Sequence, residues 1–373
     1  MTTTVRAPRA WRTLSLAAAA AAALAASAWT SGAGAQQQQR RASAARAETA
    51  PEVHWWPVRK NIWMLVGAGA NITASVGPDG VFLVNAGDAR SSARVLTAIQ
   101  ELQAQLNAFG FLDVRTAEKG GSETRSRFPV NTHPPPKPIR YIIDTNVLPT
   151  SVGGNEALAK SGITYTGGNV AGTIADSAEG AAILAHENVL NRMVQADLPF
   201  ASLPTETFFT PDYKLSTFFN DEGIQIIHIP AASTDGDAMV YFRSADVIAT
   251  GDLFNMDSFP IIDVEKGGSI NGVLTGLNDV LKLAIPEFRT EGGTMVIPGH
   301  GRLADSADVG YYRDMLTIIR DQVQALVDQG MTLDQVVAAR PTFGYEGRFG
   351  SETGAWTTKM FIEAVYRSLK KQG

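Results

Sequence analysis

The 373-residue sequence contains no cysteine. This absence excludes a disulfide-stapled scaffold and a metal site built on thiolates, and it also excludes a lipid anchor attached to a cysteine. Charged residues make up only 18% of the chain, whereas 45% are hydrophobic. That composition excludes a collagen, a coiled coil or a broadly disordered chain, and it favours one or two globular domains with a large core.

An excess of basic charge is absent as well. Lys and Arg total 32, Asp and Glu total 37, and the formal net charge is −5. Residues 1–35 hold three arginines (Arg6, Arg9 and Arg12) and no acid, so loss of that segment would change the net charge from −5 to −8. This acidic balance argues against nucleic acid as a partner.

Residues 1–35 have the pattern of a secretory signal peptide. The three arginines precede an Ala/Leu-rich stretch from about Leu14 to Ala28, and Ala33-Gly34-Ala35 offers small residues for cleavage. The stretch is shorter than the ~20 apolar residues of a membrane span. We therefore expect cleavage, export to the periplasm or the exterior, and no membrane span afterwards. Residues 36–52, with four consecutive glutamines, are predicted to be a disordered tether.

Strand and helix patterns alternate through the rest of the chain. Three short β-rich runs separated by glycine-rich turns, at residues 62–66, 72–76 and 81–84, predict an antiparallel meander. Apolar residues at spacings of three and four predict a helix over 91–108. The polar, proline-rich segment 110–138 is predicted to be an irregular insertion.

Two β-rich halves with helices outside them predict a layered α/β (α+β) sandwich. Further strands are predicted at 139–143, 207–209, 214–219, 224–229, 238–243, 247–250 and 294–297, and further helices at 156–161, 178–195, 270–285 and 307–329. We expect one domain over 53–304, with C-terminal helices of residues 305–373 packed on it.

Several polar turns follow predicted strands in a fixed order. They are Thr145 with Gly153-Gly154-Asn155 downstream, Ser233-Thr234-Asp235-Gly236-Asp237, Ala249-Thr250-Gly251-Asp252 and Pro298-Gly299-His300-Gly301. Together with the meander, this order resembles the metallo-β-lactamase superfamily over residues 53–304. The resemblance implies a four-layer αββα sandwich, with two zinc ions and a bridging water at the shared edge of its two sheets.

Most of the zinc ligands that the resemblance implies are missing. The family's His-x-His-x-Asp-His segment falls on Asn146, Leu148, Thr150 and Ser151, and its next histidine falls on Ser233; Asp252 and His300 remain. Asn85 stands where the family commonly has a supporting aspartate. Because a hydrolytic zinc needs about three protein ligands, we expect no tightly bound metal cofactor.

Asp252 and His300 are therefore the candidate catalytic residues of a remnant cleft, and the ligands of any metal that still binds. Asn146, Ser151, Ser233 and Asp237 are candidate binding residues. A simpler interpretation remains open for the acids and for His300, since turn residues often hydrogen-bond to the backbone of their own turn.

The other histidines lack partners at metal-ligand spacing. His186 is predicted within the 178–195 helix, in a capping or packing role, and His228 as a half-exposed strand residue. His54 is placed in a segment before the domain, and His133 in the insertion.

The leading hypothesis is an exported protein of this fold whose metal-dependent hydrolysis is reduced or lost, and which binds a small molecule or a protein partner. The alternative is an active hydrolase of ester, lactam or thioester bonds. It would use a single zinc on Asp252 and His300, or a serine nucleophile, Ser151 or Ser233, with His300 as its base.

Overall fold

The computed structural model describes residues 52–108, 136–164, 180–215, 218–285 and 292–372. The predicted signal peptide, nearly all of the tether and insertion, and His133 lie outside these ranges. The described residues belong to one compact unit. None of the helices within them is long and apolar enough to cross a membrane.

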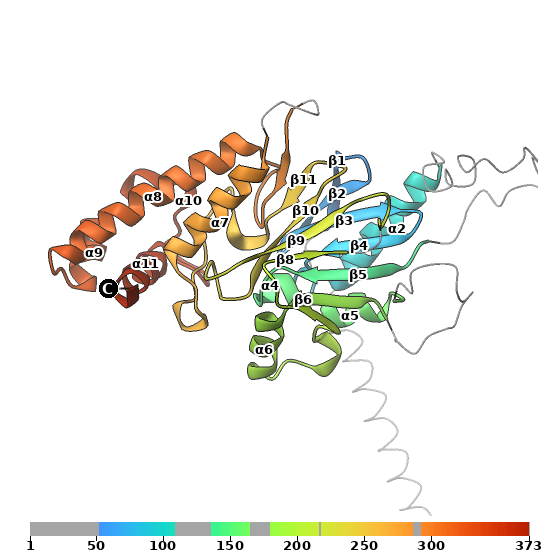
Figure 1. Ribbon diagram of the computed structural model, residues 1–373, viewed down its shortest axis with the longest axis horizontal. Coiled ribbons are helices and arrows are strands. Elements are labelled where there is room, and N and C mark those ends of the chain that lie inside the picture. Colours follow the sequence, from blue (N-terminus) through green and yellow to red (C-terminus); the bar gives the residue numbers. More distant parts are fainter. Residues whose placement is uncertain (1–51, 109–135, 165–179, 216–217, 286–291, 373) are drawn as a thin grey trace, which may run out of the picture. The chain divides into compact units, whose positions relative to one another are not determined.

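The larger sheet follows the order of the chain (Figure 1). Its strands are β1 (His54–Arg59), β2 (Ile62–Ala68), β3 (Ala70–Gly77), β4 (Gly80–Val84), β5 (Ile139–Asp144), β6 (Ala182–His186) and β7 (Glu206–Phe208). Strands β1 to β4 pair antiparallel, which confirms the predicted meander, and β4 to β7 pair parallel. Every residue of β3 is buried, because layers cover both faces of the sheet there.

The smaller sheet has the order β12-β11-β10-β9-β8. Its strands are β8 (Asp212–Lys214), β9 (Ile224–Ile229), β10 (Asp237–Phe242), β11 (Val247–Ala249) and β12 (Met295–Ile297). Strands β8 to β11 pair antiparallel, whereas β11 and β12 pair parallel and therefore end at the same edge.

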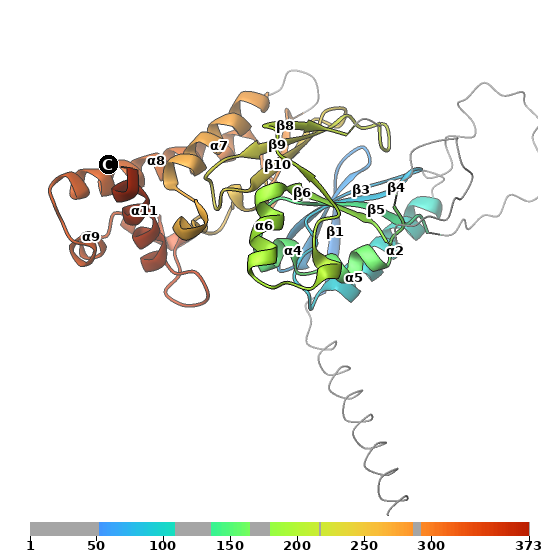
Figure 2. The same cartoon turned by 60° about the horizontal axis from the view of Figure 1, so that its bottom comes forward.

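Helices cover the outer faces of both sheets. On the larger sheet, α2 (Ser92–Ala108) and α5 (Asn155–Lys160) bury apolar side chains against β2 to β5; on the smaller one, α7 (Ile270–Leu283) and α8 (Ser306–Asp328) do the same (Figures 1 and 2). A third apolar cluster, which includes Phe82 and Phe242, fills the space between the sheets. These layers confirm the predicted αββα sandwich.

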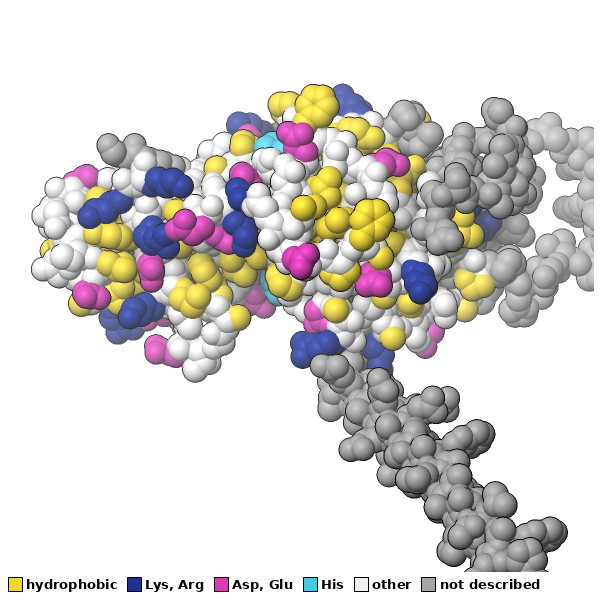
Figure 3. Space-filling view, turned by 90° about the horizontal axis from the view of Figure 1, so that it is seen from below, with side chains coloured by type: hydrophobic (Ala, Val, Ile, Leu, Met, Phe, Trp, Pro, Cys, Tyr) yellow, Lys and Arg dark blue, Asp and Glu magenta, His cyan; other side chains and the backbone are white. Residues whose placement is uncertain are grey.

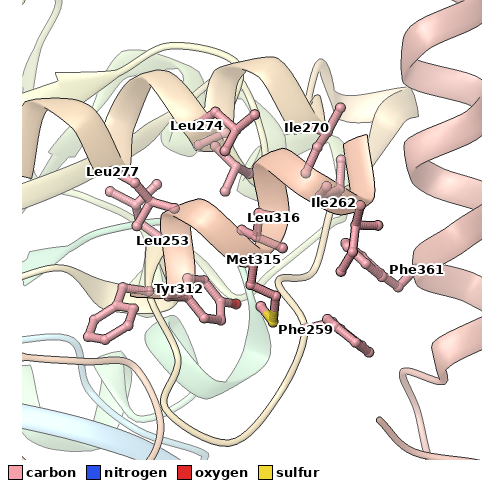
Figure 4. Packing of buried hydrophobic residues seen from close by; sticks show 14 of the residues in the cluster. Leu253, Phe259, Ile262, Ile270, Leu274, Leu277, Tyr312, Met315, Leu316 and Phe361 are labelled. Carbon is pink, nitrogen blue, oxygen red and sulfur yellow. The ribbon is translucent and has the colours of Figure 1, made fainter. Parts of the chain in front are cut away.

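The C-terminal helices extend the core on the α7–α8 side. They are α9 (Leu333–Ala339), α10 (Glu346–Phe349) and α11 (Thr358–Gln372). Phe361 of α11 stacks on Phe259, with ring centroids 4.6 Å apart, and joins the buried side chains shown in Figure 4. Helix α8 begins at a capping box, in which the Asp305 carboxylate accepts from backbone N–H groups while Asp308 accepts from the Asp305 N–H.

The prediction of one helix over 178–195 was wrong. Its described part contains strand β6, followed by α6 (Glu187–Gln195). All five β6 residues are buried, because the strand lies between β5 and β7 inside the larger sheet. A short, continuously apolar run gives no periodicity that separates a buried strand from a helix, and its alanines favour the helix.

Two smaller errors have related causes. The strand predicted over 214–219 is displaced, since β8 covers Asp212–Lys214. His54 is not in a segment before the domain but begins β1, whose residues are mostly exposed or half-buried at the sheet edge. Both β1 and β8 are edge strands. The β1 sequence, His-Trp-Trp-Pro-Val-Arg, does not alternate polar and apolar residues, and β8 is only three residues long, so neither gives a clear strand pattern. The short helix α4 (Pro149–Val152) was not predicted.

Charges of both signs lie close together on the surface. On the face seen in Figure 3, Lys and Arg side chains are interspersed with Asp and Glu side chains among the coloured, described residues. Hydrophobic side chains lie between them.

Candidate functional site

Strand ends from both sheets bring the candidate residues together. Asn146 follows β5, Asp252 follows β11 and His300 follows β12. The Ala238 N–H of β10 donates to the Thr145 carbonyl at 2.8 Å, which joins the two sheets at this edge. The structure therefore brings these three candidate residues to one edge of the sandwich.

Asp252 is the centre of the cluster and is only 1% exposed. Its Oδ2 accepts hydrogen bonds from Asn146 Nδ2 at 3.0 Å and from Ser151 Oγ at 3.3 Å. Its Oδ1 lies 3.3 Å from His300 Nε2, a distance suited to an ion pair, although no well-directed hydrogen bond reaches Oδ1. The His300 side chain is 30% exposed, so it is the member of the pair that solvent reaches.

The backbone around Asp252 depends on Gly251. Its φ is +52°, and a Cβ at this position would lie 2.2 Å from Thr145 Oγ1. Thr145 is fixed in turn by Asn85, whose Oδ1 accepts from both the N–H and the hydroxyl of Thr145 at 2.9 Å. Asn85 thus positions Thr145 at the end of β5, and only glycine fits at position 251, which faces Thr145.

A second asparagine, Asn71, holds the loop that carries His300. Its Nδ2 donates to the carbonyls of Pro298 at 3.0 Å and Gly301 at 2.9 Å, and its backbone N–H donates to Gly299 O at 2.7 Å. The sequence pattern placed Asn71 only in the turn before β3, whereas it is the second residue of that strand. The available signal was an amide side chain at the start of a β-rich run.

Burial and pairing act against each other on the two charged groups. Burial alone would raise the pKa of Asp252, but His300, Asn146 and Ser151 outweigh it and lower that pKa below its ordinary value. For His300, burial would lower the pKa, yet the adjacent Asp252 carboxylate raises it. Both shifts favour a carboxylate beside an imidazolium.

The other candidate residues lie on the turn between β9 and β10. Burial raises the pKa of Asp237 to about 8, even though its carboxylate accepts from the backbone N–H and the hydroxyl of Thr234. Ser233 is fully buried, and its Oγ has no hydrogen-bond partner among the described residues. Neither residue joins the hydrogen bonds of Asp252, so the structure brings four of the six candidates into direct contact and leaves these two beside them.

The groups around Asp252 do not fit a zinc ion. Zinc needs lone pairs from imidazole nitrogens or carboxylate oxygens, whereas Asn146 and Ser151 direct an N–H and an O–H at the carboxylate. The Asn146 amide cannot simply turn round, because its Oδ1 already accepts from the Leu148 N–H at 2.9 Å. Within the described ranges, no group of three or more His, Asp or Glu side chains is arranged to hold a metal.

His186 and His228 lie together, away from these contacts. Their rings stack with centroids 3.7 Å apart, and His186 Nδ1 accepts from the Asn188 N–H at the start of α6. The capping role predicted for His186 is confirmed, although its place within a helix is corrected to the end of β6.

No protein-family model and no curated protein sequence matches the chain. Solved structures do. DIM-1 metallo-β-lactamase matches with a TM-score of 0.47 and 13% identity over 72% of this chain and 98% of its own. The sec-alkylsulfatase Pisa1 from Pseudomonas sp. matches with a TM-score of 0.54 and 13% identity over 86% of this chain. A double mutant of that enzyme gives a TM-score of 0.56.

At this level of identity the similarity concerns the fold alone. The chain spans about half the length of the alkylsulfatase, 51% of which is covered. Together with the two sheets and their outer helices, the two alkylsulfatase matches, whose TM-scores exceed 0.5, show that the chain has a fold of the metallo-β-lactamase type.

Proposed function

We propose that this chain is an exported binding protein, built on a hydrolase-like scaffold, in which the Asp252–His300 ion pair and the donors of Asn146 and Ser151 replace the zinc site. The observation that carries the proposal is the direction of the hydrogen bonds around Asp252. In a metal site, a carboxylate lies beside other metal ligands, which present lone pairs to the cation. Around Asp252, Asn146 and Ser151 instead present hydrogen-bond donors, and His300 presents a positive charge.

The ligand would enter beside His300, the exposed end of the pair. A polar small molecule is favoured over an apolar one, because His300 offers a partly exposed imidazolium, whereas Asn146, Ser151 and Asp252 are buried. A protein partner that inserts a polar side chain would use the same group.

Metal analysis tests this proposal directly. The protein is purified with added zinc, dialysed, and analysed for metal by mass spectrometry, alongside Asp252→Ala. We expect well under one zinc per chain in both proteins and no zinc-dependent rise in melting temperature. Near-stoichiometric, firmly held zinc that disappears in Asp252→Ala would reject the proposal.

A metal-free hydrolase is the second candidate. Asp252 lies against His300 as a carboxylate lies against a catalytic imidazole, and the pairing raises the His300 pKa. Ser151 does not complete a serine mechanism, since its hydroxyl donates to Asp252 rather than to His300. Turnover of ester, lactam or thioester substrates that is lost in both Asp252→Ala and His300→Ala would favour this candidate over a binding protein. The measurement of metal content described above also tests the alternative of a hydrolase with a single zinc ion.

A further inference from the structure

Two histidines stack where α6 meets the turn between β9 and β10. His186 ends β6 and caps α6, and His228 lies in β9. Their rings are nearly parallel, at 11°, with centroids 3.7 Å apart. His186 is 4% exposed and also meets Phe208 edge-on. Because His186 is buried and His228 half-buried, two positive charges on the stacked rings would be unfavourable.

The hydrogen bonds fix where each ring can take a proton. His186 Nδ1 accepts from the Asn188 N–H at 3.2 Å, so its neutral form carries hydrogen on Nε2. Any further proton on His186 must therefore occupy the atom that caps α6. His228 Nε2 lies 2.9 Å from the Asp235 carbonyl, which requires an N–H there.

Helix α6 in turn holds the turn that carries Ser233 and Asp237. Asn188 Nδ2 donates to the Asp235 carbonyl at 2.9 Å, and the Arg192 guanidinium pairs with the Asp235 carboxylate at 2.8 Å. Gly236 packs so closely on Val189 that a Cβ there would lie 2.9 Å from a Val189 methyl carbon. The position of the turn therefore depends on α6 remaining docked.

We propose that the stacked His186–His228 pair is an acid-sensitive clamp, which holds α6 against the Ser233–Asp237 turn when neutral and releases it when His186 is protonated. Protonation has three unfavourable effects at once. It removes the acceptor of the α6 cap, places a positive charge at the positive end of a helix, and places that charge against the second ring. The inference does not depend on which ligand the site takes.

The charged and titratable groups around the pair allow this response. Burial first, and then the charge that His228 can carry, lower the pKa of His186 to about 4, although Asp235 opposes the shift. The Asp235 carboxylate already forms an ion pair with the Arg192 guanidinium. Tyr213 packs on Phe208 with a pKa raised by burial, so it stays neutral, and Glu187 follows His186 at the exposed start of α6.

Hydrogen exchange of the full chain tests the clamp. The pKa of His186 is about 4 while α6 is docked and should return to about 6.5 when α6 is released. The equilibrium constant for release of α6 should therefore be about 30-fold larger at pH 5 than at pH 8. We expect the protection factors of residues 187–195, corrected for intrinsic exchange, to fall by about that factor. Those of α7 and α8 should stay nearly constant.

Two variants and one control make the test specific. His186→Asn keeps a capping acceptor without a titrating ring, so it should lose most of the acid response. His228→Phe keeps a stacked ring without a second charge, and it should lose only the smaller part of that response, because burial is the larger cause of the His186 shift. His54→Gln removes a histidine whose side chain is 61% exposed, and it should respond as the wild type does. The proposal is overturned by constant α6 protection between pH 8 and 5, by an equal loss of protection in α7 and α8, or by an unchanged response in both variants.

Discussion

Replacing Asp252 by asparagine removes the charge on which the candidate site is centred while keeping its shape. In the wild type, the carboxylate accepts from Asn146 and Ser151 and faces His300. The asparagine has one oxygen left, so it can satisfy either the two donors or the imidazolium, and its NH2 group must face the other side. His300 then loses its counter-charge and is expected to become neutral near pH 7.

The magnitude follows from these losses. Breaking a buried ion pair costs about 3–5 kcal/mol when the remaining charge cannot escape, but His300 can release its proton. The remaining cost has two parts. The hydrogen bonds from Asn146 and Ser151 each lose about 1 kcal/mol when their acceptor is no longer charged, and part of the energy of the Asp252–His300 ion pair is lost. We expect Asp252→Asn to lower the free energy of unfolding by about 2–4 kcal/mol, a large share of the roughly 5–15 kcal/mol typical of a folded domain.

The effect should depend on pH with a defined sign. Because the His300 pKa is raised, its stabilising contribution is complete below its unfolded value of 6.5 and is lost as pH rises through the folded value. Because the Asp252 pKa is lowered, its contribution is complete above 3.8 and is lost as pH falls through the folded value. The difference between wild type and Asp252→Asn should therefore be largest between about pH 4 and 6.5.

Urea unfolding at pH 5.5 and pH 9 measures this difference, with Asp257→Asn as the control. Asp257 is exposed and acts on His300 only through its charge, so its replacement should change stability by less than about 0.5 kcal/mol. If Asp252 instead belonged to an empty cation site, Asp252→Asn would raise the stability of the metal-free protein, because it would remove a buried, uncompensated charge. Equal or greater stability of Asp252→Asn would refute the reasoning.

Two glycine substitutions test the backbone separately. Gly251→Ala should lower the free energy of unfolding by more than about 3 kcal/mol, since it adds a steric clash to a positive φ. Gly330→Ala, with φ +76° but open space around the new Cβ, should lower the free energy of unfolding by only about 1 kcal/mol. If urea titrations gave similar losses for Gly251→Ala and Gly330→Ala, the steric clash at Gly251 would be excluded. Gly310→Ala, inside α8 and equally unobstructed, should raise the melting temperature through a gain of about 0.5–1 kcal/mol; a lower melting temperature would contradict this.

The sandwich could be predicted from the sequence because its elements carry strong local signals. Helices α2, α7 and α8 repeat apolar residues at helical spacing, and the hairpin between β3 and β4 is marked by Gly77-Pro78-Asp79-Gly80. Strand β6 could not be predicted in the same way. Its identity as a strand depends on neighbours from distant parts of the chain, β5 and β7, which no local pattern describes.

The same distinction applies to the site. The ends of β5, β11 and β12 predicted that Asn146, Asp252 and His300 would meet, and they do. The direction of the hydrogen bonds could not be predicted, because it depends on the Leu148 N–H that fixes the Asn146 amide. The stacking of His186 on His228 was missed for a similar reason, since the two belong to different sheets.

The requirement that a buried charge be compensated connects these observations. Asp252 lies at a strand end that the fold buries almost completely, so its carboxylate needs either a cation or hydrogen-bond donors. A chain that loses metal-ligating side chains but keeps this aspartate must therefore supply donors in their place. An amide at 146 and a hydroxyl at 151 do so, and His300 supplies the positive charge. Under the proposed function, these donors let Asp252 remain ionised inside the protein without a bound cation, so the scaffold can stay intact in the absence of zinc.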